Sequence, residues 1–186
     1  MPNHCKNVLK IECSDKALMK EIKKTLLHVR KWVDAPPDLQ FTMRNFMPRP
    51  DDLKEGEYGD WHREHWGTKK DCYYTSLNED TPTSLEVFYE TAWSPNWSFL
   101  CKYINEVLLG KVEKIVSYYY EYGGDFSGYY EYNKDTGIEI QEHYDTCDGI
   151  EQHFPEPTPE EVAERKAKME ARLKDMQERP HTWTIK

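Results

Sequence analysis

The densest group of chemically capable side chains in this sequence lies between Trp61 and Asp71. The segment contains indole rings that can stack on a flat ligand, a histidine that titrates near neutral pH, and a carboxylate that can orient a group or take its proton. Its threonine hydroxyl and lysine amines can bind phosphate or carboxylate oxygens, and Gly67 would let the backbone approach a ligand closely. These features predict a site for a nucleotide or a similar anion. The candidate ligand-binding residues are Trp61, His65, Trp66, Thr68, Lys69, Asp71 and, from outside the segment, Trp93.

Two other interpretations of this segment stay open on sequence grounds. In the first, it is a structural turn in which Trp61 and Trp66 fill the edge of a sheet and Lys69 pairs with Asp71. In the second, the chain is an enzyme with His65 and Asp71 as acid and base, although no pattern assigns a catalytic residue. Phosphate-loop, dinucleotide-binding and zinc-ligand spacings are absent from the sequence. We therefore expect no cofactor and no metal.

The negative charge of the chain is concentrated in one stretch. The net charge is −9, and residues 121–161 carry twelve acidic residues against one basic residue, Lys134. Such a field attracts basic protein surfaces and disfavours direct nucleic-acid binding, because it repels phosphates. Tyrosines interleave with these acids, and together they could form a surface for a protein partner. In the alternative interpretation, the tyrosines pack between strands and the acidic residues only confer solubility. The candidate partner-binding residues are Tyr120, Glu121, Tyr130, Glu131, Glu139 and Glu142.

The elements that must position these residues follow from hydrophobic periodicity. Alternation at period 2 predicts a first strand over 7–13, and helical spacing then runs from Leu18 to Val33, with Ser14 as the cap. An irregular excursion follows. Further along, the patterns predict strands near 70–77 and 84–92, a helix that begins at Ser94 and Pro95 and stops at Gly110, strands over 112–122, 126–132 and 138–143, and a charge-rich helix over 158–179.

This order predicts an α+β fold with a ferredoxin-like βαββαβ antiparallel sheet, helices on one face, extra C-terminal strands and a C-terminal helix. We expect one domain over 1–150, with a long inserted loop at about 36–70, followed by a linker and the charged helix over 151–186.

Four stretches of the sequence together are typical of one protein family. They are Pro2-Asn3-His4-Cys5-Lys6-Asn7-Val8-Leu9, His65-Trp66-Gly67-Thr68-Lys69-Lys70-Asp71, Phe88-Tyr89-Glu90-Thr91-Ala92-Trp93-Ser94-Pro95 and Tyr120-Glu121-Tyr122-Gly123-Gly124-Asp125-Phe126-Ser127-Gly128-Tyr129. With these stretches the sequence resembles the YubB-type ferredoxin-like proteins of phages and plasmids. The resemblance covers most of residues 1–145, and it implies a ferredoxin-like fold and an origin in a mobile genetic element.

These observations lead to one functional hypothesis and its alternative. No apolar run is long enough to cross a membrane, and the five cysteines are widely spaced, so we expect a cytoplasmic protein of the host cell with free thiols. The hypothesis is a non-catalytic phage or plasmid accessory protein that binds a host protein, such as a nucleic-acid-binding or defence protein, through the acidic, tyrosine-rich surface, in counter-defence. The alternative is a small-ligand binder that uses the segment from Trp61 to Asp71; an enzyme is the least favoured class.

Overall fold

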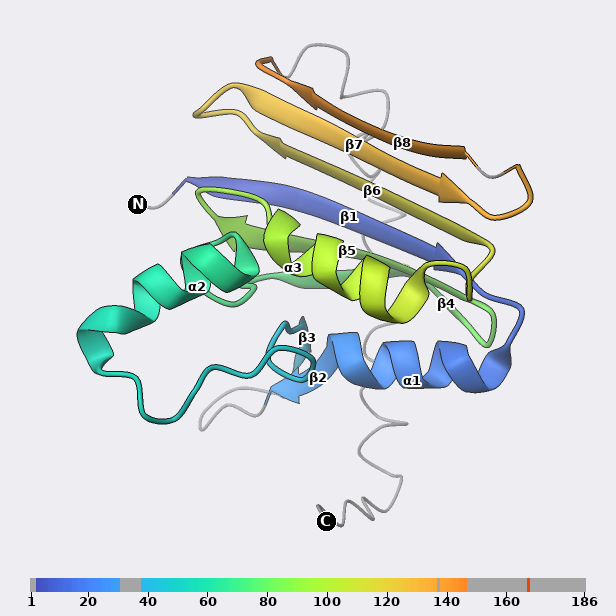
Figure 1. Cartoon of the computed structure of the whole chain (residues 1–186), viewed down its shortest axis with the longest axis horizontal. Coiled ribbons are helices and arrows are strands. Elements are labelled where there is room, and N and C mark those ends of the chain that lie inside the picture. The colour runs from blue at the N-terminus through green and yellow to red at the C-terminus, as the bar shows by residue number, and fades with distance from the viewer. Residues whose placement is uncertain (1–2, 31–37, 137, 147–166, 168–186) are drawn as a thin grey trace.

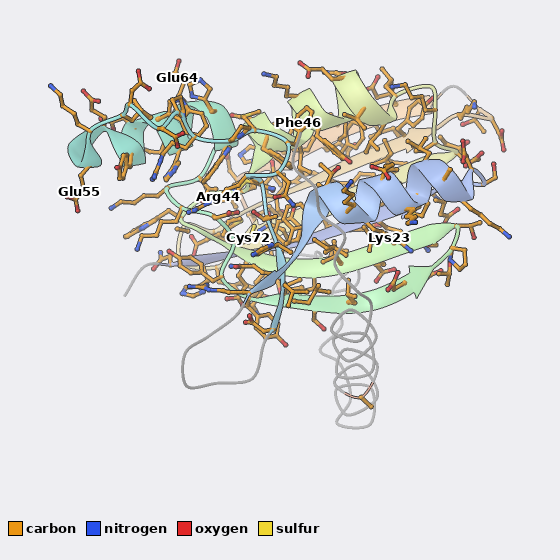
Figure 2. All side chains as sticks on the ribbon, turned by 90° about the horizontal axis from the view of Figure 1, so that it is seen from below. Lys23, Arg44, Phe46, Glu55, Glu64 and Cys72 are labelled. Atoms are coloured by element: carbon orange, nitrogen blue, oxygen red, sulfur yellow. The ribbon has the colours of Figure 1, made fainter. Side chains whose placement is uncertain are left out.

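The computed structural model describes residues 3–30, 38–136, 138–146 and 167. Three α-helices of this part, α1 (Lys16–Leu26), α2 (Tyr58–Trp66) and α3 (Trp97–Tyr103), lie on the same side of a large sheet (Figure 1 and Figure 2). The predicted α+β class and antiparallel sheet are therefore confirmed. The sheet has six strands in the order β4-β5-β1-β6-β7-β8, which are β1 (His4–Glu12), β4 (Thr75–Thr81), β5 (Ser84–Ala92), β6 (Lys114–Glu121), β7 (Phe126–Asn133) and β8 (Ile138–Tyr144).

Alternation along the strands divides this sheet into two faces. On β1, Leu9 and Ile11 are fully buried, and their partners Val87 and Leu85 on β5 are fully buried as well. These residues form one core cluster with apolar residues of α1 and α3, so we call this the inner face. The residues that alternate with them form the outer face. Because the side-chain period of a strand is two, the pairing register decides which face each residue joins.

Helix α1 begins and ends at other residues than the sequence predicts. Its cap is Asp15, whose carboxylate accepts hydrogen bonds from the backbone N–H groups of Ala17 and Leu18 at 2.9 and 3.1 Å. The predicted cap, Ser14, instead donates its hydroxyl proton to the carboxylate of Glu113 at 2.6 Å. The helix ends at Leu26, well before the predicted end near Val33, because the chain becomes extended at once.

This extended stretch is β2 (Leu27–Arg30), which pairs with β3 (Asp38–Phe41) in a second, two-stranded sheet. The register places Leu27 opposite Phe41 and His28 opposite Gln40. Leu27 and Phe41 are buried in the core, so the pair has one apolar and one polar side. Long-range pairing with β3 therefore overrides the helical spacing of the same residues.

The segment at about 36–70, predicted as a long inserted loop, contains β3, a short 3-10 helix η1 (Glu55–Glu57) and α2. Helix α2 stops at Gly67, which adopts a left-handed conformation with φ of 80°. A Cβ atom at Gly67 would lie 3.1 Å from backbone atoms of Pro95, Trp97 and Ser98, so only glycine fits this close approach without a shift. The turn thereby joins the end of α2 to the start of α3.

Helix α3 begins two residues later than predicted, with Asn96 at the cap, and continues as a π-helix η2 (Ile104–Leu108). Asn96 is held by the hydroxyl of Tyr89, which donates to its amide oxygen at 2.9 Å. Within the described ranges, no helix is long and apolar enough to span a bilayer. The predicted linker from 151 and helix over 158–179 lie outside the described residues, apart from position 167.

Candidate functional site

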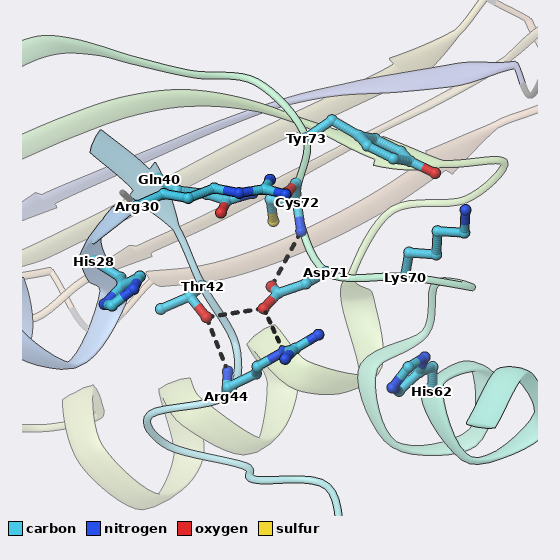
Figure 3. A pocket seen from close by; sticks show the side chains of 10 residues that line it. All are labelled: His28, Arg30, Gln40, Thr42, Arg44, His62, Lys70, Asp71, Cys72 and Tyr73. Atoms are coloured by element: carbon cyan, nitrogen blue, oxygen red, sulfur yellow. Dashed lines mark hydrogen bonds and ion pairs between the residues drawn. The ribbon is translucent and has the colours of Figure 1, made fainter. Parts of the chain in front are cut away.

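A pocket of about 500 Å³ opens between the β2–β3 pair, helix α2 and the segment that leads into β4 (Figure 3). We call it the cationic pocket. Its walls come from four stretches that are far apart in the sequence, so only the fold assembles it. It is lined by His28, Arg30, Gln40, Thr42, Arg44, His62, Lys70, Asp71, Cys72 and Tyr73.

Strand alternation turns the polar side chains of one wall toward the pocket. Leu39, Phe41 and Met43 are buried in the core, whereas Gln40 and Arg44, on the alternating positions, line the pocket. The same two-residue period continues past the end of β3, so the strand direction of the backbone sets the orientation of the wall.

Asp71 organises the centre of the pocket through both carboxylate oxygens. Its Oδ1 accepts hydrogen bonds from the backbone N–H groups of Met43 and Cys72 at 3.1 and 3.0 Å. Its Oδ2 accepts the hydroxyl proton of Thr42 at 2.9 Å and pairs with Nε of Arg44 at 3.2 Å (Figure 3). The carboxylate is thus fully occupied in holding the two walls together and orienting the Arg44 guanidinium.

The pocket carries an excess of positive charge in a chain whose net charge is −9. Three cationic side chains, Arg30, Arg44 and Lys70, and one carboxylate, that of Asp71, line the pocket, so the lining itself has a formal charge of +2. Asp38 lies opposite Arg30 in the β2–β3 register, so the cationic groups that remain for a ligand are Arg44 and Lys70. The Arg44 side chain is 60% exposed, so its outer nitrogens are open to solvent. Lys70 is exposed and makes no hydrogen bond or ion pair with any residue that the structure describes. These groups can bind an anion with charge-assisted hydrogen bonds.

His62 forms a neutral part of the wall. Its Nδ1 lies 3.0 Å from the carbonyl oxygen of Lys69, so Nδ1 carries the proton and donates it. Its ring stacks on Trp66, with centroids 4.2 Å apart and an angle of 5° between the planes. Burial lowers the pKa of His62, and the positive charges of Arg49 and Arg44 lower it further.

The remaining wall carries a thiol and a phenol. Cys72 is buried, and burial raises its pKa well above the ordinary value, so the thiol stays protonated and weakly nucleophilic. Tyr73 is half-buried and stacks on His4, with ring centroids 5.3 Å apart and 27° between the planes. Burial also raises the pKa of Tyr73, so its hydroxyl remains a neutral donor and acceptor.

Of the predicted ligand-binding residues, the fold brings only Asp71 into the cationic pocket. Trp66 and Thr68 are fully buried, which removes their side chains from contact with any ligand in this conformation. The Trp66 indole donates to the carbonyl oxygen of Met47 at 3.0 Å, and the Thr68 hydroxyl donates to that of Ala92 at 2.9 Å. Both side chains stabilise the fold.

The other predicted residues of the segment lie apart from the pocket. Trp61 stacks on His65 with ring centroids 4.3 Å apart, and the Nδ1 of His65 is hydrogen-bonded to the carbonyl oxygen of Trp61 on the same helix. Lys69 contributes a backbone carbonyl to His62, while its side chain is exposed. Trp93 is 52% exposed at the end of β5 and has a positive φ of 70°.

The predicted partner-binding residues do not form one surface. Tyr130 is buried on the inner face, where its hydroxyl donates to the exposed Glu139 at 3.1 Å. Glu121 is buried, and its carboxylate accepts from the backbone N–H groups of the turn at Gly123 and Gly124. By register, only Tyr120, Glu131 and Glu142 lie on the outer face, and Tyr120 is itself 6% exposed.

Sequence reasoning missed most of the pocket, although one signal for it was present. In the stretch from Leu39 to Arg44, polar and apolar residues alternate strictly, and the same alternation occurs from Leu27 to Arg30. Two such runs with basic residues on their polar sides indicate a paired ribbon with a cationic side. The partner segment from Lys70 to Tyr73 has no comparable pattern.

No group of three or more potential metal ligands occurs among the residues described. Comparisons with protein-family models, with curated proteins and with solved structures give no significant match for this chain.

Proposed function

We propose that this chain binds a small anion in the cationic pocket. The observation that carries the proposal is the pair of exposed cationic side chains, Arg44 and Lys70, that line the pocket within a chain of net charge −9. A local positive field in a concave site concentrates anions against the repulsion of the whole molecule. The fixed Arg44 supplies a planar donor group, and Lys70 supplies a mobile point charge.

Titration calorimetry with inorganic phosphate tests the proposal, because phosphate is a compact anion that both groups can bind. Lys70→Ala should weaken phosphate binding about tenfold, since a hydrogen bond to a charged group contributes about 1.5 to 3 kcal/mol. Lys69→Ala is the matched control, because Lys69 is the adjacent residue and carries the same charge but does not line the pocket. Equal losses in the two variants would show that only the general field attracts phosphate.

We also infer that the core is ferredoxin-like. The elements β1, α1, β4, β5, α3 and β6 follow one another in the βαββαβ order. The position of β1 between β5 and β6, with β4 next to β5 at the edge of the sheet, supports the inference. In this view β2, β3 and α2 are insertions into the first crossover, and β7 and β8 extend the sheet.

A second candidate function is binding of a basic protein on the outer face. By register, this face carries six glutamates against three lysines, so it has the charge that a basic partner requires. Its rings include the Tyr118–Tyr129 pair, with centroids 4.9 Å apart, and Tyr144, which is 42% exposed. The glutamates are Glu12, Glu79, Glu86, Glu90, Glu131 and Glu142, and the lysines are Lys6, Lys10 and Lys114.

This second candidate keeps the hypothesis of a phage or plasmid accessory protein that binds a host protein in counter-defence, with a partner surface redefined by the strand register. The resemblance to YubB-type proteins supports such an origin. An oligolysine peptide is a suitable first probe, since it presents positive charge without a fold of its own. Hydroxyl-radical footprinting should show protection of Tyr144 by the peptide, and protection of Trp93 or His65 alone would contradict the assignment to the outer face.

A further inference from the structure

We propose that the anion in the cationic pocket is the phosphate of a mononucleotide, whose base stacks on the ring of Tyr73. This inference rests on the anion site proposed above and names the class of ligand that it takes. Its starting point is the size of the pocket. About 500 Å³ exceeds what a phosphate ion fills and falls in the range of sites for small organic ligands.

The wall beside the cations is aromatic and held in place. The backbone N–H of Tyr73 donates to the carbonyl oxygen of Glu90 at 3.0 Å, which fixes the backbone from which the ring extends. The ring itself is backed by His4, whose Nδ1 lies 2.6 Å from the carboxylate of the same Glu90. Figure 3 shows the Tyr73 ring nearly edge-on along one side of the pocket. A ring that is already ordered can stack on a base without losing further side-chain freedom.

The phosphate and base positions belong to one short segment. Lys70 and Tyr73 are three residues apart, so their Cα atoms are separated by at most about 10 Å. A single nucleotide can therefore place its phosphate at Lys70 and Arg44 and its base at Tyr73. Gln40 lies on the facing wall and donates from Nε2 to the carbonyl oxygen of Cys72, so its amide oxygen can accept a hydrogen bond from a ribose hydroxyl.

The charge distribution favours a mononucleotide over a polynucleotide. A strand of RNA or DNA would carry phosphates beyond the pocket, toward a chain with 34 acidic and 25 basic residues. Each added phosphate meets repulsion there, whereas a mononucleotide keeps its negative charge within the cationic pocket.

Calorimetry on the full chain with three ligands decides the proposal. AMP, ribose 5-phosphate and inorganic phosphate share the phosphate and differ in the sugar and the base. AMP should bind at least about tenfold more tightly than ribose 5-phosphate, because stacking on an aromatic side chain contributes roughly 1 to 3 kcal/mol for each base. GMP, CMP and UMP in the same assay then show which base is preferred.

Two variants of Tyr73 and one control variant test whether the base stacks on the Tyr73 ring. Tyr73→Leu should abolish the preference for AMP over ribose 5-phosphate while leaving the affinity for inorganic phosphate unchanged, and Tyr73→Phe should retain the preference. Tyr74→Leu is the matched control, because Tyr74 is the adjacent tyrosine, is 53% exposed and does not line the pocket. The thermal midpoint of each variant is measured first, and the ligand series on the unmodified chain is decisive even if a variant unfolds.

Each outcome has a distinct meaning. Equal affinities for ribose 5-phosphate and all four mononucleotides would overturn the nucleotide assignment and leave the anion site standing. Loss of the AMP preference in Tyr74→Leu would overturn the role of Tyr73. Tighter binding of a single-stranded oligonucleotide than of AMP would overturn the mononucleotide class. If no ligand of the series binds, the proposed anion function fails and this inference fails with it.

Discussion

The Nδ1 atom of His62 lies 3.0 Å from the carbonyl oxygen of Lys69. This hydrogen bond ties helix α2 to the segment that carries Lys70 and Asp71 into the cationic pocket. The ring of His62 is stacked on the buried Trp66 on its other side, so the imidazole links the helix, the core and the pocket wall. Nδ1 already donates in the neutral ring, so protonation would place the second proton on Nε2, which is buried and has no hydrogen-bond partner among the described residues.

The lowered pKa of His62 predicts a loss of stability in mild acid. The ordinary histidine pKa is about 6.5, and burial lowers it in the folded chain. Between the two pKa values the unfolded chain binds the proton and the folded chain does not, so the stability is complete above pH about 6.5 and falls below it. Thermal midpoints measured from pH 8 down to pH 5 should drop less steeply for His62→Phe, which keeps a stacked ring without a titrating group. His28→Asn, which removes an exposed histidine of the same pocket, is the control for the loss of an imidazole.

Truncation of Trp61 and of Trp66, the two tryptophans of helix α2, should lower the free energy of unfolding by different amounts. Trp66 is fully buried, so Trp66→Ala should lower the free energy of unfolding by about 3 to 5 kcal/mol, the cost of emptying a large core site. Trp61→Ala should cost less, because its side chain is only partly buried against the core. Urea denaturation measures both. A Trp66→Ala variant as stable as the unmodified chain would contradict the structural role of this indole.

The large sheet could be predicted from the sequence because its signals are local. Leu9 and Ile11 alternate with polar residues, and the apolar run that contains Leu85 and Val87 has the same period. The inner face of each strand therefore follows from the sequence alone. The end of α1 could not be predicted in this way, since Leu26 and Val29 fit helical spacing while Leu27 and Val29 fit the two-residue spacing of a strand.

The candidate site was harder to predict because its residues are brought together by long-range contacts, which leave no local pattern in the sequence. His28 and Gln40 meet only because β2 pairs with β3, and Asp71 joins them through contacts to Thr42 and Arg44. None of these relationships has a sequence period. The segment from Trp61 to Asp71 was identified by its residue types, yet helical geometry turns Trp66 into the core, and Asp71 is the only predicted ligand-binding residue of the segment that lines the pocket.

The positive φ of Trp93 predicts an unusual stability order among its variants. A left-handed conformation costs an L-residue about 1 to 2 kcal/mol, and glycine avoids this cost. Trp93→Gly should therefore be more stable than Trp93→Ala by about 1 kcal/mol, the reverse of the usual order. Gly110→Ala calibrates the effect, because Gly110 has a φ of 75° and open space where its Cβ would lie. Thermal or urea unfolding of the four proteins gives the comparison, and an alanine variant at 93 that exceeds the glycine variant would contradict the strain.

The two faces of β8 provide a matched test of partner binding. Glu139 and Glu142 are both exposed and lie three residues apart on the same strand, but the register places Glu142 opposite Tyr129 on the outer face and Glu139 opposite Tyr132 on the inner face. Each Glu→Gln substitution removes one negative charge, so the two variants share the same net charge. If a basic partner docks on the outer face, Glu142→Gln should slow association with an oligolysine peptide more than Glu139→Gln does.

The difference between these variants should shrink as salt rises, because interactions between exposed charges are screened over about 8 Å at physiological ionic strength. Association rates measured by surface plasmon resonance at low and at physiological salt give both comparisons. Equal slowing by the two substitutions would mean that the peptide senses only the total charge, and the outer face would then have no special role in binding. A larger effect of Glu139→Gln would place the partner on the side of the helices instead.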